Sequence, residues 1–205
     1  MSSSDNLAAS GAAPPLPLVS AMIRARLPGG FSVLLAGSGL VEYSRLTPQV
    51  REQLLGIIGT VAPRFDVILL DTGAGISDVV LYSISLADEV LIVATPEPTS
   101  MTDAYATIKV LATHQQRRAI SIVVNQVSRV GEGRAIRGQL QLVVDRFVAP
   151  MLPTGDAVPK LELIGEVPLD GAVREAVQKR QLLLEALPGA PAARAIEIVA
   201  TRLAP

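Results

Sequence analysis

The 205-residue sequence contains no cysteine and a single histidine, His114. Without cysteine there is no disulfide, thiolate nucleophile or cysteine-ligated zinc site, and one histidine leaves little room for Ser-His or multi-histidine chemistry. Charge of one sign is also lacking, because 18 Lys and Arg residues stand against 19 Asp and Glu residues. Binding driven by charge to nucleic acid is therefore not expected. The chemistry that remains is that of carboxylates, hydroxyls and backbone groups, or binding.

Long hydrophobic runs are missing as well. Uninterrupted apolar runs such as residues 67–70 fall far short of the ~20 residues that a membrane span needs. Residues 1–19 are small and proline-rich, without the basic start and apolar segment of a signal peptide. The sequence therefore predicts a cytoplasmic globular chain, with a poorly packed lead-in at 1–19 and one domain at 20–205.

Short apolar runs alternate along the chain with longer stretches of helical period. This alternation predicts an α/β fold, a doubly wound and mostly parallel sheet with helices on both faces. The expected strands cover residues 31–35, 66–70, 89–94, 119–124 and 161–167.

Helix signals fall between these runs. Thr47 and Pro48 supply an N-cap and a first-turn proline for a helix that ends near Pro63. Ser100 and Asp103 have the spacing of a capping box and predict a helix that begins at Ser100. Further helices are expected at residues 76–87, 132–147, 172–184 and 191–203.

The expected strand at 66–70 leads into Asp71-Thr-Gly-Ala-Gly75. Ligands of open parallel sheets bind beyond the carboxyl ends of the strands, so Asp71 is a candidate ligand for magnesium, which prefers oxygen donors. Gly75 offers flexible backbone whose amide can approach a phosphate. Two interpretations stay open: a Walker B and switch region, or a turn in which Asp71 only caps the following helix.

Two later strand ends also carry candidate residues. Asn125 follows the run at 119–124, and its carboxamide can offer a donor and an acceptor to an adenine edge, although a plain turn residue is the alternative. Pro168 follows the last run and is a candidate wall of a base pocket. Asp170 is better explained as the N-cap of the next helix.

Four segments together resemble a known family: residues 65–76 (FDVILLDTGAGI), 94–110 (ATPEPTSMTDAYATIKV), 123–127 (VVNQV) and 163–170 (LIGEVPLD). Over about residues 20–203 the chain is similar to the MinD/ParA class of P-loop ATPases. Within that class it is most similar to the FlhG (FleN) branch, which regulates flagellar number and placement. The run that begins Thr-Pro-Glu-Pro-Thr-Ser is typical of this branch.

The resemblance implies ATP and Mg²⁺ as cofactors. It places Asp71 on the magnesium side, Gly75 near the terminal phosphate, Asn125 at the adenine and Pro168 beside the base. It further implies a nucleotide-dependent homodimer that moves between the cytosol and the inner membrane. Such a protein works with an FlhF-like GTPase or another flagellar component, without direct binding to nucleic acid.

The sequence departs from the family pattern at the phosphate-binding loop. The family's first strand leads into a deviant Walker A loop, which is rich in glycine and carries two lysines. The only lysines here, Lys109, Lys160 and Lys179, lie in no such run. Weak nucleotide binding or none is therefore expected from this chain alone, and ATP hydrolysis stays open. A truncated family member and a pseudo-ATPase both fit, the latter being a non-enzymatic module that binds FlhF or a flagellar component.

The last expected helix carries an apolar stripe. A stripe of this kind can lie on a membrane surface or pack against the sheet, and the mixed charge around it favours packing. The stripe consists of Ala192, Ala195, Ile196, Val199 and Leu203. His114 is expected at a solvated helix end, where a cation suits the helix dipole, and not as a metal ligand.

Overall fold

The computed structural model describes residues 23–24, 30–34 and 47–203. It divides between Leu70 and Asp71 into two compact units, which are described separately. In the first unit, β1 (Ile23–Arg24) pairs antiparallel with β2 (Val33–Leu34). The strand expected at 31–35 is thus shorter within the described residues, and it lies in an antiparallel pair instead of the parallel sheet. The lead-in expected at 1–19 lies outside the described residues.

Helix α2 (Pro48–Val61) follows the predicted signals in the first unit. The Thr47 hydroxyl accepts a hydrogen bond from the Val50 amide at 3.3 Å, and Pro48 occupies the first turn. The helix continues into the 3-10 turn η2 (Ala62–Arg64), where Pro63 stands. The predicted start and end of this helix are therefore confirmed.

Residues 66–70 form no strand, although their apolar pattern predicted one. Val67, Ile68, Leu69 and Leu70 are all exposed, and Leu69 retains 85% of its accessible surface. A strand needs a neighbouring strand to satisfy its backbone groups, and none pairs with this segment in the described part of the chain. The prediction of a strand here was wrong for that reason.

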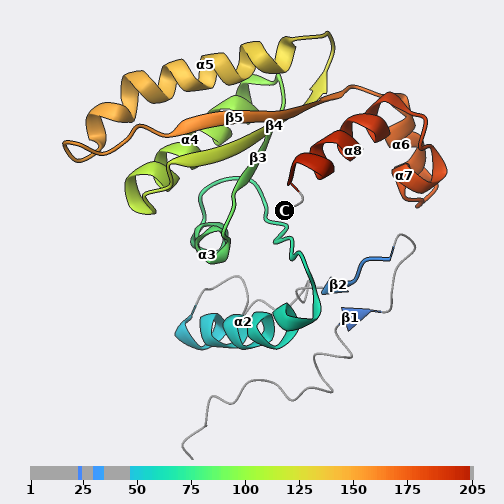
Figure 1. Cartoon of the computed structure of the whole chain (residues 1–205), viewed down its shortest axis with the longest axis horizontal. Coiled ribbons are helices and arrows are strands. Elements are labelled where there is room, and N and C mark those ends of the chain that lie inside the picture. Colours follow the sequence, from blue (N-terminus) through green and yellow to red (C-terminus); the bar gives the residue numbers. More distant parts are fainter. Residues whose placement is uncertain (1–22, 25–29, 35–46, 204–205) are drawn as a thin grey trace, which may run out of the picture. The chain divides into compact units, whose positions relative to one another are not determined.

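The second unit is built on a parallel sheet in the order β3-β4-β5 (Figure 1). Its strands are β3 (Leu91–Ala94), β4 (Ala119–Val127) and β5 (Lys160–Pro168). In the ladder, Leu91–Ala94 lie opposite Ser121–Val124. Helix α4 (Pro98–His114) connects β3 to β4, and α5 (Glu132–Phe147) connects β4 to β5. The expected α/β fold with a parallel sheet is confirmed.

The remaining helices confirm some predicted boundaries and correct others. Helix α8 (Pro191–Leu203), like α5, has the predicted bounds, whereas the helix expected at 172–184 is interrupted. It consists of α6 (Gly171–Gln178) and the short α7 (Leu183–Ala186). A 3-10 turn, η3 (Ala149–Met151), follows α5. Helix α3 (Asp78–Leu86) begins two residues later than expected.

The capping box predicted at Ser100 was wrong. Helix α4 begins at Pro98 with Glu97 as its N-cap residue, so Ser100 lies within the first turn. The Ser100 hydroxyl accepts a hydrogen bond from the Thr95 amide at 2.9 Å. This side chain therefore fixes the chain between β3 and α4 and does not cap the helix. At the other end of α4, His114 is exposed as predicted.

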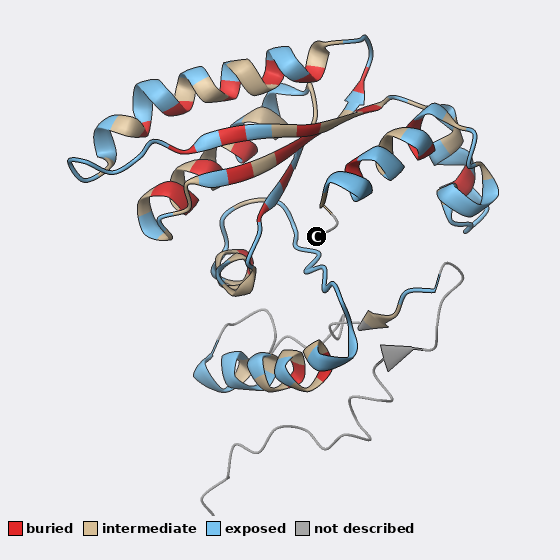
Figure 2. Ribbon diagram, in the orientation of Figure 1, coloured by how far each residue is buried: buried red, intermediate tan, exposed pale blue. Residues whose placement is uncertain are grey.

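Helices cover both faces of the sheet, and the buried residues lie between the layers (Figure 2). On one face α4 and α5 pack on alternate residues of all three strands, including Ile92, Ile122 and Leu161. On the other face the predicted stripe of α8 packs against Val123, Ile164 and neighbouring residues. The expectation that this stripe docks on the sheet is confirmed. Within the described ranges, no helix has the length and apolar character to cross a membrane.

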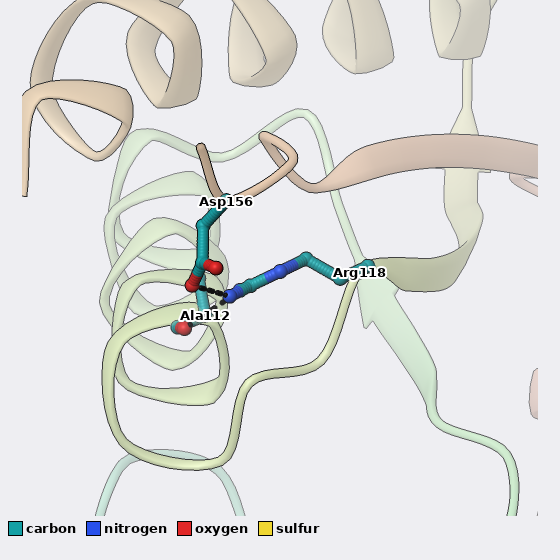
Figure 3. Close-up of polar contacts among 3 residues, drawn as sticks. All are labelled: Ala112, Arg118 and Asp156. Atoms are coloured by element: carbon teal, nitrogen blue, oxygen red, sulfur yellow. Dashed lines mark hydrogen bonds and ion pairs between the residues drawn. The ribbon is translucent and has the colours of Figure 1, made fainter. Parts of the chain in front are cut away.

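Arginine side chains hold the segments at the amino ends of the strands. Arg118 donates to the Ala112 carbonyl at 3.0 Å and forms an ion pair with Asp156 in the loop before β5 (Figure 3). Arg117 donates to the Asp88 carbonyl at 2.9 Å and to the Ala87 carbonyl. These contacts tie the end of α4 to its neighbours at the amino ends of the strands, opposite the carboxyl ends that carry Asn125 and Pro168.

Candidate functional site

The first group of candidate residues lies on the segment that leads into α3. Asp71 is exposed, and its carboxylate makes no hydrogen bond or ion pair with any other described residue. Ser77, not Asp71, caps α3, because its hydroxyl accepts a hydrogen bond from the Val80 amide at 3.4 Å. The interpretation of Asp71 as the cap of this helix is therefore wrong. Gly75 has a φ of 95°, a conformation that favours glycine.

The side chains around Asp71 limit the kind of magnesium site that it could belong to. Within the described ranges there is no group of three or more histidine or carboxylate side chains that could hold a metal ion. Magnesium often keeps several waters and binds through one or two carboxylates together with substrate phosphates. Asp71 therefore fits as a single ligand to a hydrated, phosphate-bound ion, and does not fit a cage made by protein alone.

The second group, Asn125 and Pro168, comes together at the carboxyl ends of β4 and β5. In the ladder Asn125 lies opposite Val167, and Val127 lies opposite Pro168. Asn125 thus belongs to β4, so the interpretation of it as a plain turn residue was wrong. The register shifts between Asn125 and Val127, where Gln126 has a φ of 59°. No described hydrogen bond or ion pair joins this group to Asp71 or Gly75.

The Asn125 carboxamide is held by its own backbone. Its Oδ1 accepts a hydrogen bond from the Gln126 amide at 2.9 Å. The side-chain NH₂ has no partner among the described residues, and the residue is half-buried. The carboxamide therefore presents two oriented donors, and its oxygen retains a second lone pair. A heterocyclic base has the ring nitrogens and exocyclic groups to use both.

Carboxylates occupy the helix N-termini at this edge of the sheet. Glu166 Oε1 accepts from the Arg134 amide in α5 at 3.1 Å. Asp170 Oδ1 accepts from the Ala172 amide in α6 at 2.9 Å, and its Oδ2 accepts from the Ala192 amide in α8 at 3.0 Å. The cap predicted at Asp170 is thus confirmed, and it serves two helices. The two backbone hydrogen bonds lower the pKa of Asp170 and outweigh the opposite effect of burial.

The helix N-termini near Asn125 and Pro168 are poor sites for a phosphate group. A helix N-terminus attracts phosphate when its amide groups are free. At α5, α6 and α8 side-chain carboxylates already take these amides and add negative charge. The carboxyl ends of β4 and β5 therefore suit an uncharged base better than a triphosphate.

Sequence reasoning missed two residues that shape this edge. Glu132 Oε2 accepts a hydrogen bond from the Ser128 amide at 2.6 Å, within the connection from β4 to α5. Its position at the start of a predicted helix was a usable signal, because acidic residues favour the first turn. Glu166 had no local signal, since its partner Arg134 lies 32 residues away in the chain.

Comparisons with known proteins show which proteins the chain is similar to. No protein-family model matches the chain. It is 35% identical over 176 residues to the Antiactivator FleN of Pseudomonas aeruginosa, an overlap of 86% of this chain and 60% of that protein. It is 29% identical over 135 residues to the Flagellum site-determining protein YlxH of Helicobacter pylori, with 66% and 42% covered. The chain thus spans less than two thirds of the length of either relative.

The fold agrees with these sequence relationships. The structure matches the crystal structure of a ParA family ATPase from Chlorobium tepidum with a TM-score of 0.63 at 19% identity. The match covers 93% of this chain and 70% of that one. The fold is thus the α/β fold of ParA-type proteins. Together with the similarity to FleN and YlxH, it indicates that the chain is related to MinD/ParA-type proteins, with FlhG-like proteins among its relatives.

Proposed function

We propose that the protein takes part in the control of flagellar number and placement. The observation that carries this proposal is the 35% identity with Antiactivator FleN over 176 residues. A second relative, YlxH, is named as a flagellum site-determining protein, which supports the same process. The proposed surroundings are the cytoplasm and, by peripheral contact, the inner membrane. The proposed partners are an FlhF-like GTPase or a flagellar component and a second copy of the chain.

At the chemical level, the proposed ligand is ATP with Mg²⁺. Asp71 would supply one magnesium ligand, and Gly75 would bring backbone close to the terminal phosphate. Asn125 would read the adenine, with Pro168 beside the base. These four residues supply no lysine and no glycine-rich cradle, so binding by this chain alone is proposed to be weak.

Flagellar counts test the biological part of the proposal. The chain is expressed in a bacterium from which the gene for its own FlhG-like regulator has been deleted. Restoration of the normal number and position of flagella is expected. Unchanged, excess flagella with the chain stably present would contradict the proposal.

Calorimetry with magnesium-ATP tests the chemical part. The chain is compared with a version preceded by a family P-loop segment, and with the Asp71→Ala variant of that version. Binding is expected in the extended version, weakened in its Asp71→Ala variant. Submillimolar binding by the chain as it stands would show that the phosphates are held by groups other than those named.

A second candidate function is that of a non-enzymatic interaction module. It is favoured by a mostly apolar groove between α4 and α5, whose lining includes Met101, Tyr105, Leu140 and Val143. An exposed apolar groove of this kind can receive apolar side chains of a partner. If Asp71→Ala restores flagellar control as well as the parent chain does, the module is the better description. If the variant is inactive, the nucleotide-dependent function is favoured.

A further inference from the structure

The start of α5 contacts the carboxyl end of β5 through one side chain. Glu166 Oε1 accepts from the Arg134 amide at 3.1 Å, in the first turn of the helix. Gly133 is buried directly against the same side chain, and a Cβ there would lie 2.6 Å from Glu166 Cγ. The contact therefore requires glycine in the helix and places a carboxylate on free amides of its N-terminus.

The neighbouring residues of β5 explain why Glu166 has this direction. Gly165 faces α8, because a Cβ on it would lie 2.2 Å from Val199 Cγ2. Ile164 also packs on the α8 side, at the register shift between β4 and β5. Glu166 follows on the α5 side. The irregular register thus presents a charged side chain to the start of α5, where a regular strand would continue its alternation.

A second carboxylate holds the connection between β4 and α5. Glu132 Oε2 accepts from the Ser128 amide at 2.6 Å, and its Oε1 lies 3.8 Å from Arg129 Nε. The connection begins after Val127, the last residue of β4, and ends at Gly131, the N-cap residue of α5; Gln126, with its positive φ, lies just before it. Glu132 therefore joins the two ends of the connection, and Glu166 fixes the start of α5 to β5, the strand that carries Pro168.

We propose that Glu166 is a positioning residue of the base-recognition end: by fixing the first turn of α5 to β5, it holds the Asn125 carboxamide and Pro168 in one geometry. The proposal rests on the proposed function, because it assumes that Asn125 and Pro168 contact adenine. It assigns to Glu166 no contact with the nucleotide. Its effect passes through Arg134, Gly133 and the connection to Asn125.

A set of variants separates this role from simple packing. Glu166→Ala removes the acceptor, whereas Glu166→Gln keeps an oxygen in the same place. Gly133→Ala with Glu166→Ala fills the space left by the carboxylate without restoring the hydrogen bond to Arg134. Glu162→Ala is the matched control, since Glu162 lies on the same strand and is exposed.

Two measurements are made on the full chain. The first is amide hydrogen exchange across residues 126–134 without ligand. The second is a titration of the ¹⁵N-labelled chain with adenosine, and with guanosine as the competing base, followed at the Asn125 side-chain amide. Nucleosides are used because they need no phosphate-binding loop.

Glu166→Ala is expected to speed exchange in residues 126–134 and to weaken adenosine binding by about tenfold, as for a lost hydrogen bond to a charged group. The preference for adenosine over guanosine is expected to fall with it. Glu166→Gln is expected to remain within about threefold of the parent chain, because its oxygen still accepts. In the double variant adenosine binding is expected to stay weak, because the added methyl group fills space but does not restore the hydrogen bond to Arg134.

Three results would overturn the inference. Exchange and binding in Glu166→Ala that match those in Glu162→Ala would show that Glu166 positions nothing. Recovery of adenosine binding in the double variant would show that only packing matters. If the parent chain gives no shift with adenosine, the base pocket of the proposed function fails, and the role of Glu166 in recognition fails with it. In that case, faster amide hydrogen exchange in Glu166→Ala would still show that Glu166 holds the connection, so the failure would lie in the proposed base pocket.

Discussion

Residues 66–70 and the middle of β4 have similar apolar sequences and very different surroundings. In β4, Ile120, Ile122 and Val124 are almost completely buried, with neighbouring strands on both sides and helices α4 and α5 above. In the segment 66–70, Leu69 is almost wholly exposed, and no strand pairs with it in the described part of the chain. Apolar β-branched residues thus favour a strand, but the ladder and the covering layer decide whether it forms.

Helices α2 and α5 differ in the same way. Both are amphipathic and of similar length, yet α2 buries only Ile57 and Val61. Helix α5 buries four positions along its inner face, including Ile136, Leu140 and Val144. Because most helical stability in proteins comes from packing of the apolar face, α5 is expected to be far more stable than α2.

The largest effect should come from truncating a buried leucine of the sheet, for comparison with the same change in residues 66–70. Leu161 in β5 is fully buried, so Leu161→Ala should lower the free energy of unfolding by about 2–5 kcal/mol. Leu69→Ala should change the free energy of unfolding by less than about 0.5 kcal/mol, because the exposed side chain makes few packing contacts that the substitution could remove. Chemical denaturation measures both. An equal cost for Leu69→Ala would show that residues 66–70 are buried in solution.

The next effect concerns the contact between β5 and α8. Gly165→Ala would place a Cβ 2.2 Å from Val199 Cγ2, so the helix must shift, at a cost of about 1–3 kcal/mol. Combining it with Val199→Ala should recover part of this loss in thermal denaturation. Gly138→Ala in α5 is the control, since nothing lies within 4 Å of its added Cβ. A harmless Gly165→Ala would mean that α8 is not held against the sheet.

A smaller, pH-dependent effect is expected at Asp170. Its folded-state pKa lies below the ordinary value of 3.8 because two backbone amides donate to it. The carboxylate therefore stabilises the fold above that value, and the contribution is lost as the pH falls through the lowered pKa. The stability difference between the parent chain and Asp170→Ala should be full at about pH 7 and shrink at about pH 3. A difference independent of pH would contradict the double cap.

The smallest effect is expected at the ion pair of Arg118 and Asp156. Their side chains are 27% and 35% exposed, so solvent screens the pair, and its coupling should be about 0.2–1 kcal/mol. A double-mutant cycle of Arg118→Ala and Asp156→Ala in urea gives this coupling. The single Arg118→Ala change should cost more than Asp156→Ala, since it also removes the hydrogen bond to the Ala112 carbonyl. A coupling far above this range would mark the loop before β5 as rigidly held.

The sequence predicted those elements whose signals are local. Helix α5 matched its expected bounds, and the cap at Asp170 followed from the residue type before an amphipathic stretch. The strand at 66–70 failed because its formation depends on a partner elsewhere in the chain. Asn125 was predicted as a site residue, but its place inside β4 follows from the ladder to β5. The contact of Glu166 could not be predicted for the same reason, because its partner Arg134 lies on a different element, far away in the sequence.

The strands of the parallel sheet follow one another in space in the same order as along the chain. Each strand therefore joins a neighbour already present, after a single helical crossover has closed a short loop. Such local closure favours rapid folding and allows the sheet to grow during synthesis, from the amino-terminal strand onwards. On the ribosome, β3 and α4 have already emerged when β4 is made, so the sheet should begin to form with β4, and β5 with α8 should complete the layers last.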